Sequence, residues 1–501
     1  MSRLPAPLVE ELTPPPDPEG CCARLAGLPY RVWLDSAARG APLGRHSFLA
    51  ADPAIVVRGK GRSAEWLDLA TGTRHPASGD AIATVKALLA PHAAEPAPGL
   101  PPFQGGAIGY VAYDWGETLE RLPAPRYDDL ALPDVVFGLY DWVIAWDHAA
   151  GRAWLISTGL PAAAPAARAR RAADRLAAVK RRLRGAAPTR IAAAPAFPPL
   201  TARPREHAPS YPAAGWWDTG LELRSSFSHR DYLAAVARVR EYILAGDIFQ
   251  ANLSQRFEAP LTEAPWALYR RLRARNPAPF AAFLDFPEAP VLSASPERFL
   301  RVGAAGDVET RPIKGTRPRG HGPEHDAALG RALTESAKDR AENLMIVDLL
   351  RNDLSRVCSP GSVRVPELFA LERHPTVHHL VSTVVGRLGE GADALDLLRA
   401  AFPGGSITGA PKVRAMEIIA ELEPSRRGVY CGAVGYWSTG GELDTSIAIR
   451  TSVAVGGRVY FSAGGGIVAD SDPEQEYRET LDKARGLIAA LEPAETAGAG
   501  P

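Results

Sequence analysis

Residues 310–316 place one lysine, Lys314, between an isoleucine and a glycine in a turn-forming sequence. The chain has 57 lysine and arginine residues, and only seven of them are lysine. Since this protein uses arginine where charge alone is needed, a lysine beside a Gly-Thr turn is a candidate for chemistry. A desolvated lysine can lose its proton and act as a nucleophile, which arginine cannot do. The alternative is an ordinary lysine on a surface loop.

A carboxylate on the apolar face of a predicted helix is the second candidate. Ser336 and Asp339 have the spacing of a helix-capping pair, and apolar residues follow at helical intervals. Glu342 shares a face with Ile346 and Leu349, which lie four and seven positions further on. A lone charge there is costly unless it is paired, protonated or bound to a metal ion. The alternative is a glutamate at the edge of the apolar face that meets an arginine.

A second predicted helix carries two more carboxylates. Asp472 fits its N-cap, and Glu476, Glu479 and Lys483 then share one face. Three glycines at 464–466 precede this helix, so a backbone can approach a ligand closely there. Two carboxylates one turn apart suit Mg²⁺, which takes few protein carboxylates and completes its shell with water and substrate. The alternative is a solvated helix face.

A third glycine-rich turn, at 403–412, leads into an amphipathic run that ends at residue 422. Such a turn presents free N–H groups and the positive end of a helix dipole, which suits a carboxylate or a phosphate. Its spacing from glycine to Lys412 is not that of a phosphate-binding P-loop, so a small-molecule carboxylate is the expected anion.

Composition limits the classes of function. The net charge is +0 with a pI near 7.2, which gives no indication of a nucleic-acid or anionic-membrane partner. The acids and prolines among the first twenty residues predict no signal peptide, and no apolar run is long enough to span a membrane. The spacing of the four cysteines, none in a CxxC pattern, argues against a zinc site or a disulfide framework and favours a cytoplasmic location.

The elements that must position these residues fall into two folded parts. Alternating apolar residues and a glycine-rich segment predict strands at 31–34, 54–57, 103–113 and 135–140, and an Ala/Arg-rich run predicts an exposed helix at 161–185. We therefore expect a strand-rich N-terminal domain at 1–185, an Ala/Pro-rich linker or surface loop at 186–226, a catalytic domain at 227–491 and a disordered tail at 492–501.

Six motifs, in order and over roughly residues 228–490, resemble those of the chorismate-utilising enzymes. They are Ser-Pro-Glu-Arg-Phe at 295–299, Pro-Ile-Lys-Gly-Thr at 312–316, the helix at 341–349, His-His-Leu-Val-Ser at 378–382, the turn at 403–412 and the segment 464–483. The N-terminal half matches more loosely. The resemblance implies a large α+β fold with central packed antiparallel sheets and outer helices.

The resemblance also assigns roles by position. It implies chorismate as substrate and Mg²⁺ held by Glu342 and Glu479, with Glu476 binding directly or through water. Glu297 would be the general acid that protonates the departing C4 hydroxyl. The substrate-binding positions would be Gly315, Thr316, His379, Thr408, Tyr430, Arg450, Gly464, Gly465, Gly466 and Lys483. No specific role follows for His379 or Thr408, whereas the planar guanidinium of Arg450 suits a bidentate contact with a carboxylate.

Lys314 separates the branches of this family. Anthranilate synthase large subunits typically have alanine at this position, and their ammonia attacks C2 of chorismate directly. The branch that aminates chorismate at C4, on the route to 4-aminobenzoate and folate, has lysine, which attacks C2 before ammonia enters at C4. The resemblance therefore predicts a covalent Lys314 intermediate. A branch that uses water has a lysine where this chain has Gln250.

Ammonia must come from elsewhere, because no cysteine has the glycine-flanked setting of a glutaminase nucleophile. We therefore expect a separate glutamine amidotransferase subunit. The resemblance also implies a possible tryptophan pocket near Ser36, Pro279 and Phe280. The remaining alternatives are an anthranilate synthase large subunit and a non-catalytic chorismate-binding regulatory subunit, which would not need Lys314, Glu297 and the three acids together.

Overall fold

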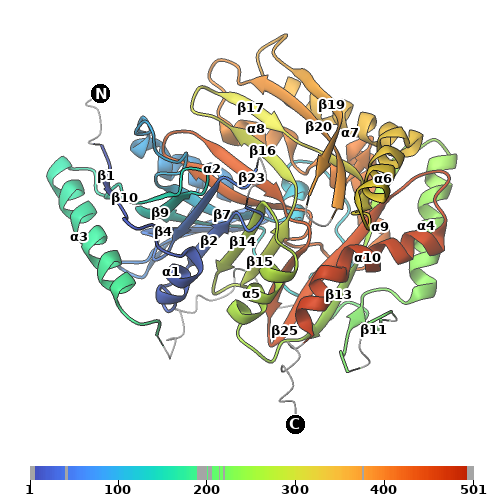
Figure 1. Cartoon of the computed structure of the whole chain (residues 1–501), viewed down its shortest axis with the longest axis horizontal. Coiled ribbons are helices and arrows are strands. Elements are labelled where there is room, and N and C mark those ends of the chain that lie inside the picture. The colour runs from blue at the N-terminus through green and yellow to red at the C-terminus, as the bar shows by residue number, and fades with distance from the viewer. Residues whose placement is uncertain are drawn as a thin grey trace.

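The computed structural model describes residues 6–39, 43–188, 200, 206–213, 215–217, 220–374 and 377–492. Two large antiparallel sheets lie in the centre, and the helices lie outside them (Figure 1). This arrangement is the predicted α+β fold with packed central sheets.

The first sheet has 13 strands. In spatial order they are β1 (Leu8–Glu11), β10 (Arg152–Ser157), β9 (Trp142–Asp147), β3 (His46–Ala50), β2 (Arg31–Asp35), β14 (Phe280–Asp285), β15 (Val291–Ser295), β24 (Thr451–Val455), β25 (Arg458–Ile467), β13 (Gln250–Pro260), β12 (Arg224–Ser225) and β11 (Tyr211–Pro212), with β21 (Gly409–Ala410) beside β13.

The second sheet has 12 strands. They are β18 (Ile313–Pro318), β20 (Val377–Arg387), β17 (Asp307–Thr310), β16 (Arg298–Val302), β23 (Leu443–Ile447), β22 (Ala433–Ser438), β7 (Gly106–Val111), β8 (Val135–Tyr140), β4 (Ile55–Lys60), β5 (Ser63–Asp68) and β6 (Thr73–Pro76), with β19 (Arg364–Arg373) beside β20.

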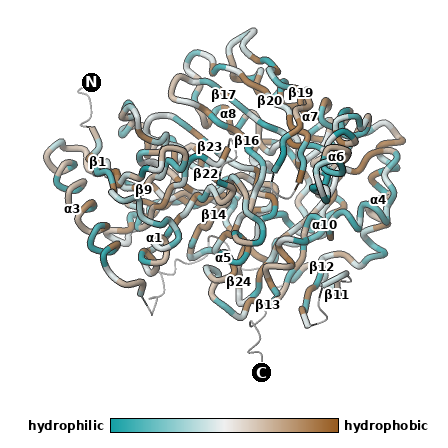
Figure 2. Tube along the Cα trace, viewed as in Figure 1, coloured by the Kyte–Doolittle hydropathy of each residue, from teal (hydrophilic) through white to brown (hydrophobic). Residues whose placement is uncertain are grey.

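The α-helices of the described residues cover the outer faces of the sheets. They are α1 (Pro18–Arg24), α2 (Ala81–Leu89), α3 (Pro165–Arg184), α4 (His229–Leu244), α5 (Pro265–Arg275), α6 (Pro323–Glu335), α7 (Ala337–Ser355), α8 (Ala394–Ala401), α9 (Lys412–Leu422) and α10 (Pro473–Leu491). The outer helices α4 and α6 carry teal, hydrophilic stretches in Figure 2. No helix in the described part of the chain combines the length and apolar character needed to cross a bilayer.

The interior has one apolar core between the sheets and one on each outer face. Along β8, Val136 and Tyr140 belong to the core between the sheets, whereas Val135, Phe137 and Leu139 pack toward α2 and α8. Because both faces of this strand are buried, its sequence is an almost unbroken apolar run. The outer core of the first sheet is formed with α4, α5, α9 and α10.

Both halves of the chain contribute strands to both sheets. β2 pairs with β14, with Trp33 opposite Phe283, and β7 pairs with β22, with Gly109 opposite Gly435. The boundary expected near 185–227 therefore divides the sequence into two segments, but it does not separate one sheet from the other. Much of the expected linker (189–199, 201–205, 214 and 218–219) and the tail at 493–501 lie outside the described residues.

The local predictions from sequence are confirmed where they can be checked. β2, β4 and β8 lie at the predicted strands, and α3 lies within the predicted helix at 161–185. The glycine-rich segment forms β7, where a Cβ on Gly109 would lie 1.9 Å from the carbonyl oxygen of Val136. All four cysteines are buried and free, so no disulfide framework is present.

Candidate active site

Glu297 lies on the short connection between β15 and β16, and its backbone is fixed on both sides. Its N–H lies 3.3 Å from Ser295 Oγ, and its carbonyl accepts from the N–H of Ile447 at 3.1 Å. The residue is 5 % exposed. Burial raises the pKa of the Glu297 carboxyl to about 7, although the Ser406 hydroxyl and the charge of Lys314 act in the opposite direction. Glu297 can therefore hold a proton near neutral pH.

Lys314 projects from an irregular part of β18. The register against β20 shifts between Ile313 and Thr316, and Gly315 has φ +87°. Such a bulge redirects a side chain out of the regular pleat. A Cβ on Gly315 would lie 2.8 Å from Leu333 Cδ1 and 2.9 Å from Asp339 Oδ1, so only glycine fits there.

The electrostatic setting of Lys314 favours a neutral amine. Burial lowers the pKa of Lys314, and the nearby positive charge of Lys483 lowers it further, while Glu342, Glu297 and Glu479 act in the opposite direction. Within the described residues, the Lys314 ammonium forms no hydrogen bond or close ion pair. The alternative of an ordinary surface lysine does not fit this half-buried position.

Glu476 and Glu479 converge over Gly465 from α10. A Cβ on Gly465 would lie 3.0 Å from Glu476 Oε2 and 3.3 Å from Glu479 Oε1. Glu476 is 5 % exposed and accepts from Ser471 Oγ at 2.6 Å, whereas Glu479 is exposed and pairs with Lys483 Nζ at 2.6 Å. The helix starts as predicted, because the Asp472 side chain accepts from a backbone N–H of the first turn. The two carboxylates therefore face the glycine strand.

Glu342 comes from α7, whose predicted cap is present: Ser336 Oγ accepts from the N–H of Asp339 at 3.2 Å. Burial raises the pKa of Glu342, and the charges of Lys314 and Lys338 oppose this effect. The charge of Glu479 also acts on Glu342, so the two helices bring their carboxylates into one electrostatic neighbourhood.

The carboxylates of Glu342, Glu476 and Glu479 suit a hard, oxygen-preferring cation, although they do not enclose one. Among the described residues, no group of three or more His, Cys, Asp and Glu side chains is arranged to enclose a metal ion. Two convergent carboxylates with a third acting on them match an ion that fills most of its shell with water and substrate. These residues therefore fit Mg²⁺, and magnesium binding stays a prediction.

The glycines at 464–466 form the part of β25 beside β13. Lys483 Nζ donates to the Gly464 carbonyl at 3.0 Å. A Cβ on Gly464 would lie 2.4 Å from the Leu253 carbonyl oxygen, and one on Gly466 would lie 2.1 Å from Gln250 Nε2. Glycine is required at 464, where the backbone of β13 leaves no room for a side chain, whereas at 466 the movable end of Gln250 occupies the space.

His379 and Arg450 add a neutral and a charged donor. His379 Nδ1 lies 2.9 Å from Thr316 Oγ1, and burial together with the Arg450 charge lowers the pKa of His379 to about 3. Arg450 adopts φ +50°, and burial lowers its pKa, opposed by Glu297. The neutral His379 imidazole and the Arg450 guanidinium, which act on each other, are both groups suited to hold a carboxylate of a small substrate.

Thr408 and Tyr430 are buried side chains with structural contacts. Thr408 Oγ1 donates to the Gly404 carbonyl at 3.0 Å, and its own carbonyl accepts from the Asn252 N–H at 2.7 Å. Tyr430 packs near the Arg427 guanidinium, which lies 6.0 Å from its ring centroid. Their contact with substrate stays a prediction.

Two side chains near this site were missed from the sequence. Lys338, one helical turn before Glu342, acts electrostatically on Glu342, Glu476 and Glu479. Its i,i+4 spacing from Glu342 is the signal that could have indicated it. Ser406 faces Glu297 from the turn at 403–412, and no spacing rule indicates that contact.

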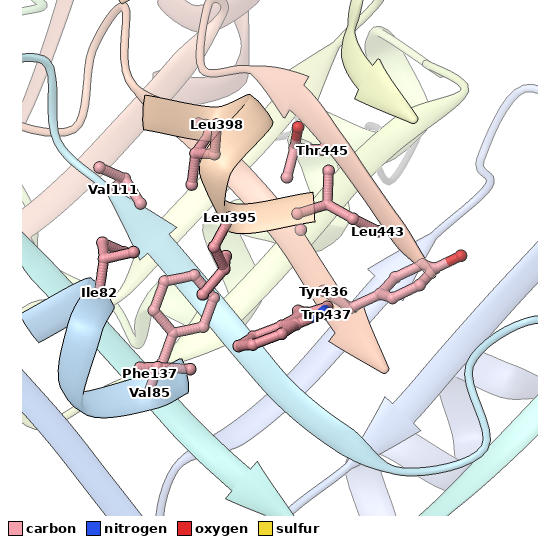
Figure 3. Close-up of a pocket in the computed structure, with 12 residues that line it drawn as sticks. Ile82, Val85, Val111, Phe137, Leu395, Leu398, Tyr436, Trp437, Leu443 and Thr445 are labelled. Carbon is pink, nitrogen blue, oxygen red and sulfur yellow. The ribbon is translucent and has the colours of Figure 1, made fainter. Parts of the chain in front are cut away.

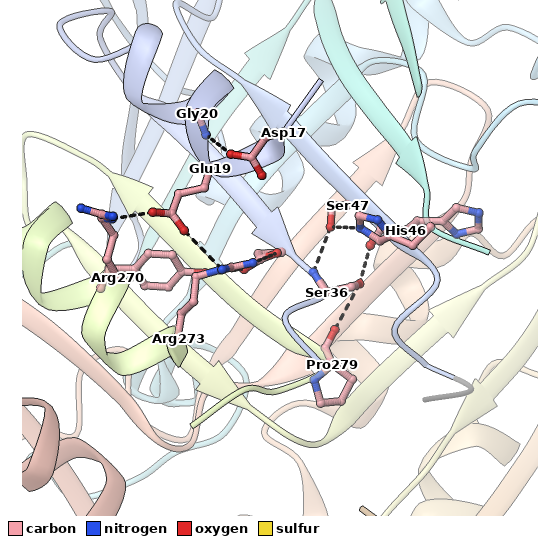
Figure 4. A network of polar contacts seen from close by, with 12 residues as sticks. Asp17, Glu19, Gly20, Ser36, His46, Ser47, Arg270, Arg273 and Pro279 are labelled. Atoms are coloured by element: carbon pink, nitrogen blue, oxygen red, sulfur yellow. Dashed lines mark hydrogen bonds and ion pairs between the residues drawn. The ribbon is translucent and has the colours of Figure 1, made fainter. Parts of the chain in front are cut away.

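The predicted tryptophan pocket coincides with a cavity of about 420 Å³ between the sheets, a volume within the range of small-ligand sites. Ser36, Pro279 and Phe280 all line it, together with charged residues such as Arg298 and Asp444. In Figure 4 Ser36 lies between Ser47 and Pro279; its N–H donates to Ser47 Oγ at 3.0 Å. The ligand itself stays a prediction.

A second, much smaller cavity has a different character. It has a volume of about 10 Å³ and is surrounded by apolar side chains from α2, α8 and the second sheet, including Ile82, Phe137 and Leu398 (Figure 3). This volume barely accommodates one water molecule, and most of the side chains that line it are apolar. It is a packing gap and not a substrate site.

Comparisons with known proteins agree with this fold. The family model of the chorismate binding enzyme matches residues 35–489. Aminodeoxychorismate synthase component 1 from Klebsiella aerogenes is 47% identical over 398 residues, 79% of each chain. Anthranilate synthase component 1 from Streptomyces coelicolor is 46% identical over 428 residues, 84% of this chain and 79% of that protein. The crystal structure of anthranilate synthase component I from Streptococcus pneumoniae matches with a TM-score of 0.72 and 32% identity, covering 90% of this chain and 93% of that chain.

The fold is thus that of the chorismate-utilising enzymes. The chain belongs to the chorismate-binding enzyme family. Its similarity to aminodeoxychorismate synthase component 1 extends over most of its length, as the motif resemblance predicts. Anthranilate synthase relatives are nearly as similar, so overall identity does not separate the two branches.

Proposed function

We propose that this chain is the component of an aminodeoxychorismate synthase that converts chorismate and ammonia to 4-amino-4-deoxychorismate. The observation that carries the proposal is Lys314: a half-buried lysine with a lowered pKa, beside an acid, Glu297, whose pKa is raised to about 7. A neutral amine next to a protonated acid is the pairing needed for attack at one carbon and departure of a hydroxyl at another.

In the first step, the Lys314 amine forms a bond to C2 of chorismate. The ring electrons shift, the C4–oxygen bond breaks, and Glu297 donates a proton so that the hydroxyl leaves as water. Since Lys314 attacks as a free base, the pKa lowered by its burial favours this step. Glu297 must be protonated at the same time, and its own burial supplies that condition.

In the second step, ammonia forms a bond to C4, and the bond between C2 and the Lys314 nitrogen breaks. The lysine leaves as a free amine, and the ammonium group formed at C4 gives up one proton, which restores the acid form of Glu297. The net change is the replacement of the C4 hydroxyl by an amino group, with release of one water. Ammonia would come from a separate glutamine amidotransferase subunit. The term "component 1" in the names of the relatives supports a partner, and all four cysteines of this chain are buried.

Glu342, Glu476 and Glu479 would hold Mg²⁺, which when bound draws electron density toward the ring carboxylate of the substrate. Arg450 and the neutral His379–Thr316 pair would bind one carboxylate of chorismate, and Lys483 with the glycine strand would bind the other. The hydrogen bond from Lys483 Nζ to the Gly464 carbonyl, at 3.0 Å, supports the assignment of Lys483 to the glycine strand.

The resemblance to the chorismate-utilising enzymes implies tryptophan as the ligand of the cavity of about 420 Å³. The volume of the cavity and its lining, which includes Phe280 and both acidic and basic side chains, are compatible with an aromatic amino acid. Whether it regulates the reaction is a separate question that binding measurements with and without chorismate address.

Anthranilate synthesis is the second candidate, because the relative from Streptomyces coelicolor is 46% identical. The product formed from chorismate, Mg²⁺ and an ammonium salt by the purified chain tests the choice. We expect aminodeoxychorismate, identified by mass and by conversion to 4-aminobenzoate with an added lyase. Fluorescent anthranilate as the main product would overturn the proposal.

A further inference from the structure

The bulge of β18 at Gly315, which presents Lys314, packs against the junction between α6 and α7. A Cβ on Gly315 would lie 2.8 Å from Leu333 Cδ1 at the end of α6 and 2.9 Å from Asp339 Oδ1 in the first turn of α7. Leu333 is fully buried, and its carbonyl accepts from the Ser336 N–H at 3.3 Å, which joins the two helices. The bulge therefore rests on a fixed surface.

Asp339 also holds the residues that follow the bulge. Its Oδ2 atom forms an ion pair with Arg317 Nη2 at 2.8 Å, while Nη1 of the same guanidinium donates to the Thr316 carbonyl at 2.9 Å. A planar guanidinium makes both bonds at once in a fixed geometry. The Arg317–Asp339 ion pair thus ties the strand beyond the bulge to the start of α7.

The neighbouring strand β20 fixes the other edge of β18. Thr316 lies opposite His379 in the sheet register, and its Oγ1 atom is 2.9 Å from His379 Nδ1. Within the part of the chain that the structure describes, no hydrogen bond or ion pair holds the Lys314 amine itself. The place of this amine is therefore set by the backbone on either side of the bulge.

The ion pair also relates this backbone to Glu342. Asp339 and Glu342 lie three positions apart on α7, so their side chains are neighbours on the helix surface. The Arg317 side chain is 37 % exposed and that of Asp339 is 15 % exposed. Because an ion pair open to water contributes little to stability, we expect its main effect on geometry.

We propose that Arg317 and Asp339 are positioning residues. Their ion pair holds the bulge against α7 and thereby fixes the place of the Lys314 amine relative to Glu342 and the substrate. This inference rests on the proposed role of Lys314 as the nucleophile. A displacement of about 1 Å in a reacting group can lower a rate about 100-fold, so loss of the ion pair should lower kcat about tenfold or more. KM should change little, because the loss falls on the transition state.

The test compares Asp339→Ala and Arg317→Met with the milder Asp339→Asn and Arg317→Lys, and with Asp348→Asn as a matched control. Asp348 also lies on α7 and pairs with an arginine, Arg351, at 3.0 Å, but both side chains belong to the same helix and that of Asp348 is 76 % exposed. The two stronger variants should lower kcat about tenfold or more. The two milder variants each keep a hydrogen-bonding group and should lose less, and Asp348→Asn should match the wild type.

A double-mutant cycle separates positioning from a general effect on the fold. The variant that combines Asp339→Ala with Arg317→Met should be about as slow as the slower single variant, because the two side chains act as one unit. Losses that multiply, or a lower unfolding temperature with an unchanged kcat, would overturn the inference. If the stronger variants do not fold, a several-fold loss of kcat in Asp339→Asn and Arg317→Lys supports the inference, and wild-type kcat in both contradicts it.

The dependence on Mg²⁺ distinguishes Lys314 from the carboxylates as the group that is positioned. The Mg²⁺ concentration that gives half the maximal rate should stay at the wild-type value in Asp339→Ala. A higher requirement for Mg²⁺, with normal kcat once the ion is saturating, would assign the ion pair to Glu342 alone and contradict the inference.

Chorismate consumption is the measured rate in each case, so the comparison does not depend on whether ammonia enters at C4 or C2. Without ammonia, the rate at which chorismate adds to Lys314 should fall in Asp339→Ala by about the same factor as kcat. A wild type that adds chorismate to Lys314, with a rate that the variants leave unchanged, contradicts this inference alone. A wild type that forms no adduct contradicts the proposed function. In that case the loss caused by Asp339→Ala should disappear in a Lys314→Ala background, and an equal loss there would contradict the inference as well.

Discussion

Replacing Glu297 by glutamine should make the protein more stable at pH 8 while removing most of its activity. Burial raises the pKa of Glu297 to about 7 from an ordinary value of 4.5. One pKa unit corresponds to about 1.4 kcal/mol, so keeping this carboxylate ionised in the folded protein at pH 8 costs about 3 kcal/mol. Glutamine has nearly the same shape and keeps an acceptor for the Ile313 N–H and Ser406, but carries no charge.

The sign of the effect depends on pH. Between pH 4.5 and 7 the folded protein holds a proton at Glu297 that the unfolded chain has lost, so this group makes the wild type less stable as the pH rises through that window. Glu297→Gln should therefore equal the wild type in stability near pH 4.5 and exceed it by about 3 kcal/mol at pH 8. The same protonation predicts that kcat/KM falls as the pH rises through about 7.

The assay is thermal or urea unfolding of both proteins at pH 5 and pH 8, with Glu390→Gln as the control. Glu390 lies exposed on a turn, so its replacement should change stability little at either pH. Turnover of chorismate by Glu297→Gln should fall at least roughly 100-fold, the usual contribution of a general acid. If the stability of Glu297→Gln relative to the wild type does not increase from pH 5 to pH 8, the view of Glu297 as a buried proton carrier is refuted.

Four further predictions concern the metal, the partner subunit, the Lys412–Asp353 ion pair and the cavity of about 420 Å³. EDTA should abolish turnover, and full activity in metal-free buffer would contradict this prediction. Mg²⁺ should also raise the unfolding temperature of the wild type, and it should raise that of Glu342→Gln or Glu479→Gln much less. The purified chain should use ammonium salts but not glutamine, and glutamine-dependent turnover by the isolated chain would show that a catalytic cysteine had been overlooked. Lys412→Met should destabilise the fold by roughly 3–5 kcal/mol, because it leaves the buried Asp353 carboxylate unpaired, and Lys412→Met with Asp353→Leu should recover part of that loss in urea unfolding. Tryptophan should bind the wild type in calorimetry and bind Ser36→Phe weakly or not at all, and equal binding would place its site elsewhere.

The parts of the fold that could be predicted are those set by local sequence. The cap at Ser336, the start of α10 after Asp472 and the glycine-rich β7 all follow from residue types within a few positions. The pairing of β2 with β14 and of β7 with β22 could not be predicted in this way. These contacts join residues hundreds of positions apart, and periodicity carries no information about them.

The same distinction between local sequence and long-range contacts applies to the residues of the site. Spacing indicated that Glu476 and Glu479 share a helix face, and they converge over the glycine strand as expected. The bulge that redirects Lys314 and the contact of Ser406 with Glu297 arise only from tertiary packing. Lys338 is an intermediate case, because its i,i+4 relation to Glu342 is local and was available from the sequence.

The most direct test of the central claim is a mass measurement on Lys314. The wild type, incubated with chorismate and Mg²⁺ but without ammonia, should gain the mass of chorismate less one water on the peptide that contains Lys314. Lys314→Ala should gain nothing, should lose turnover more through kcat than through KM, and should release an anthranilate-type product if ammonia can attack C2 instead. Absence of the adduct, together with near-normal amination at C4 by Lys314→Ala, would contradict the covalent role and leave Lys314 as an electrostatic contact to substrate.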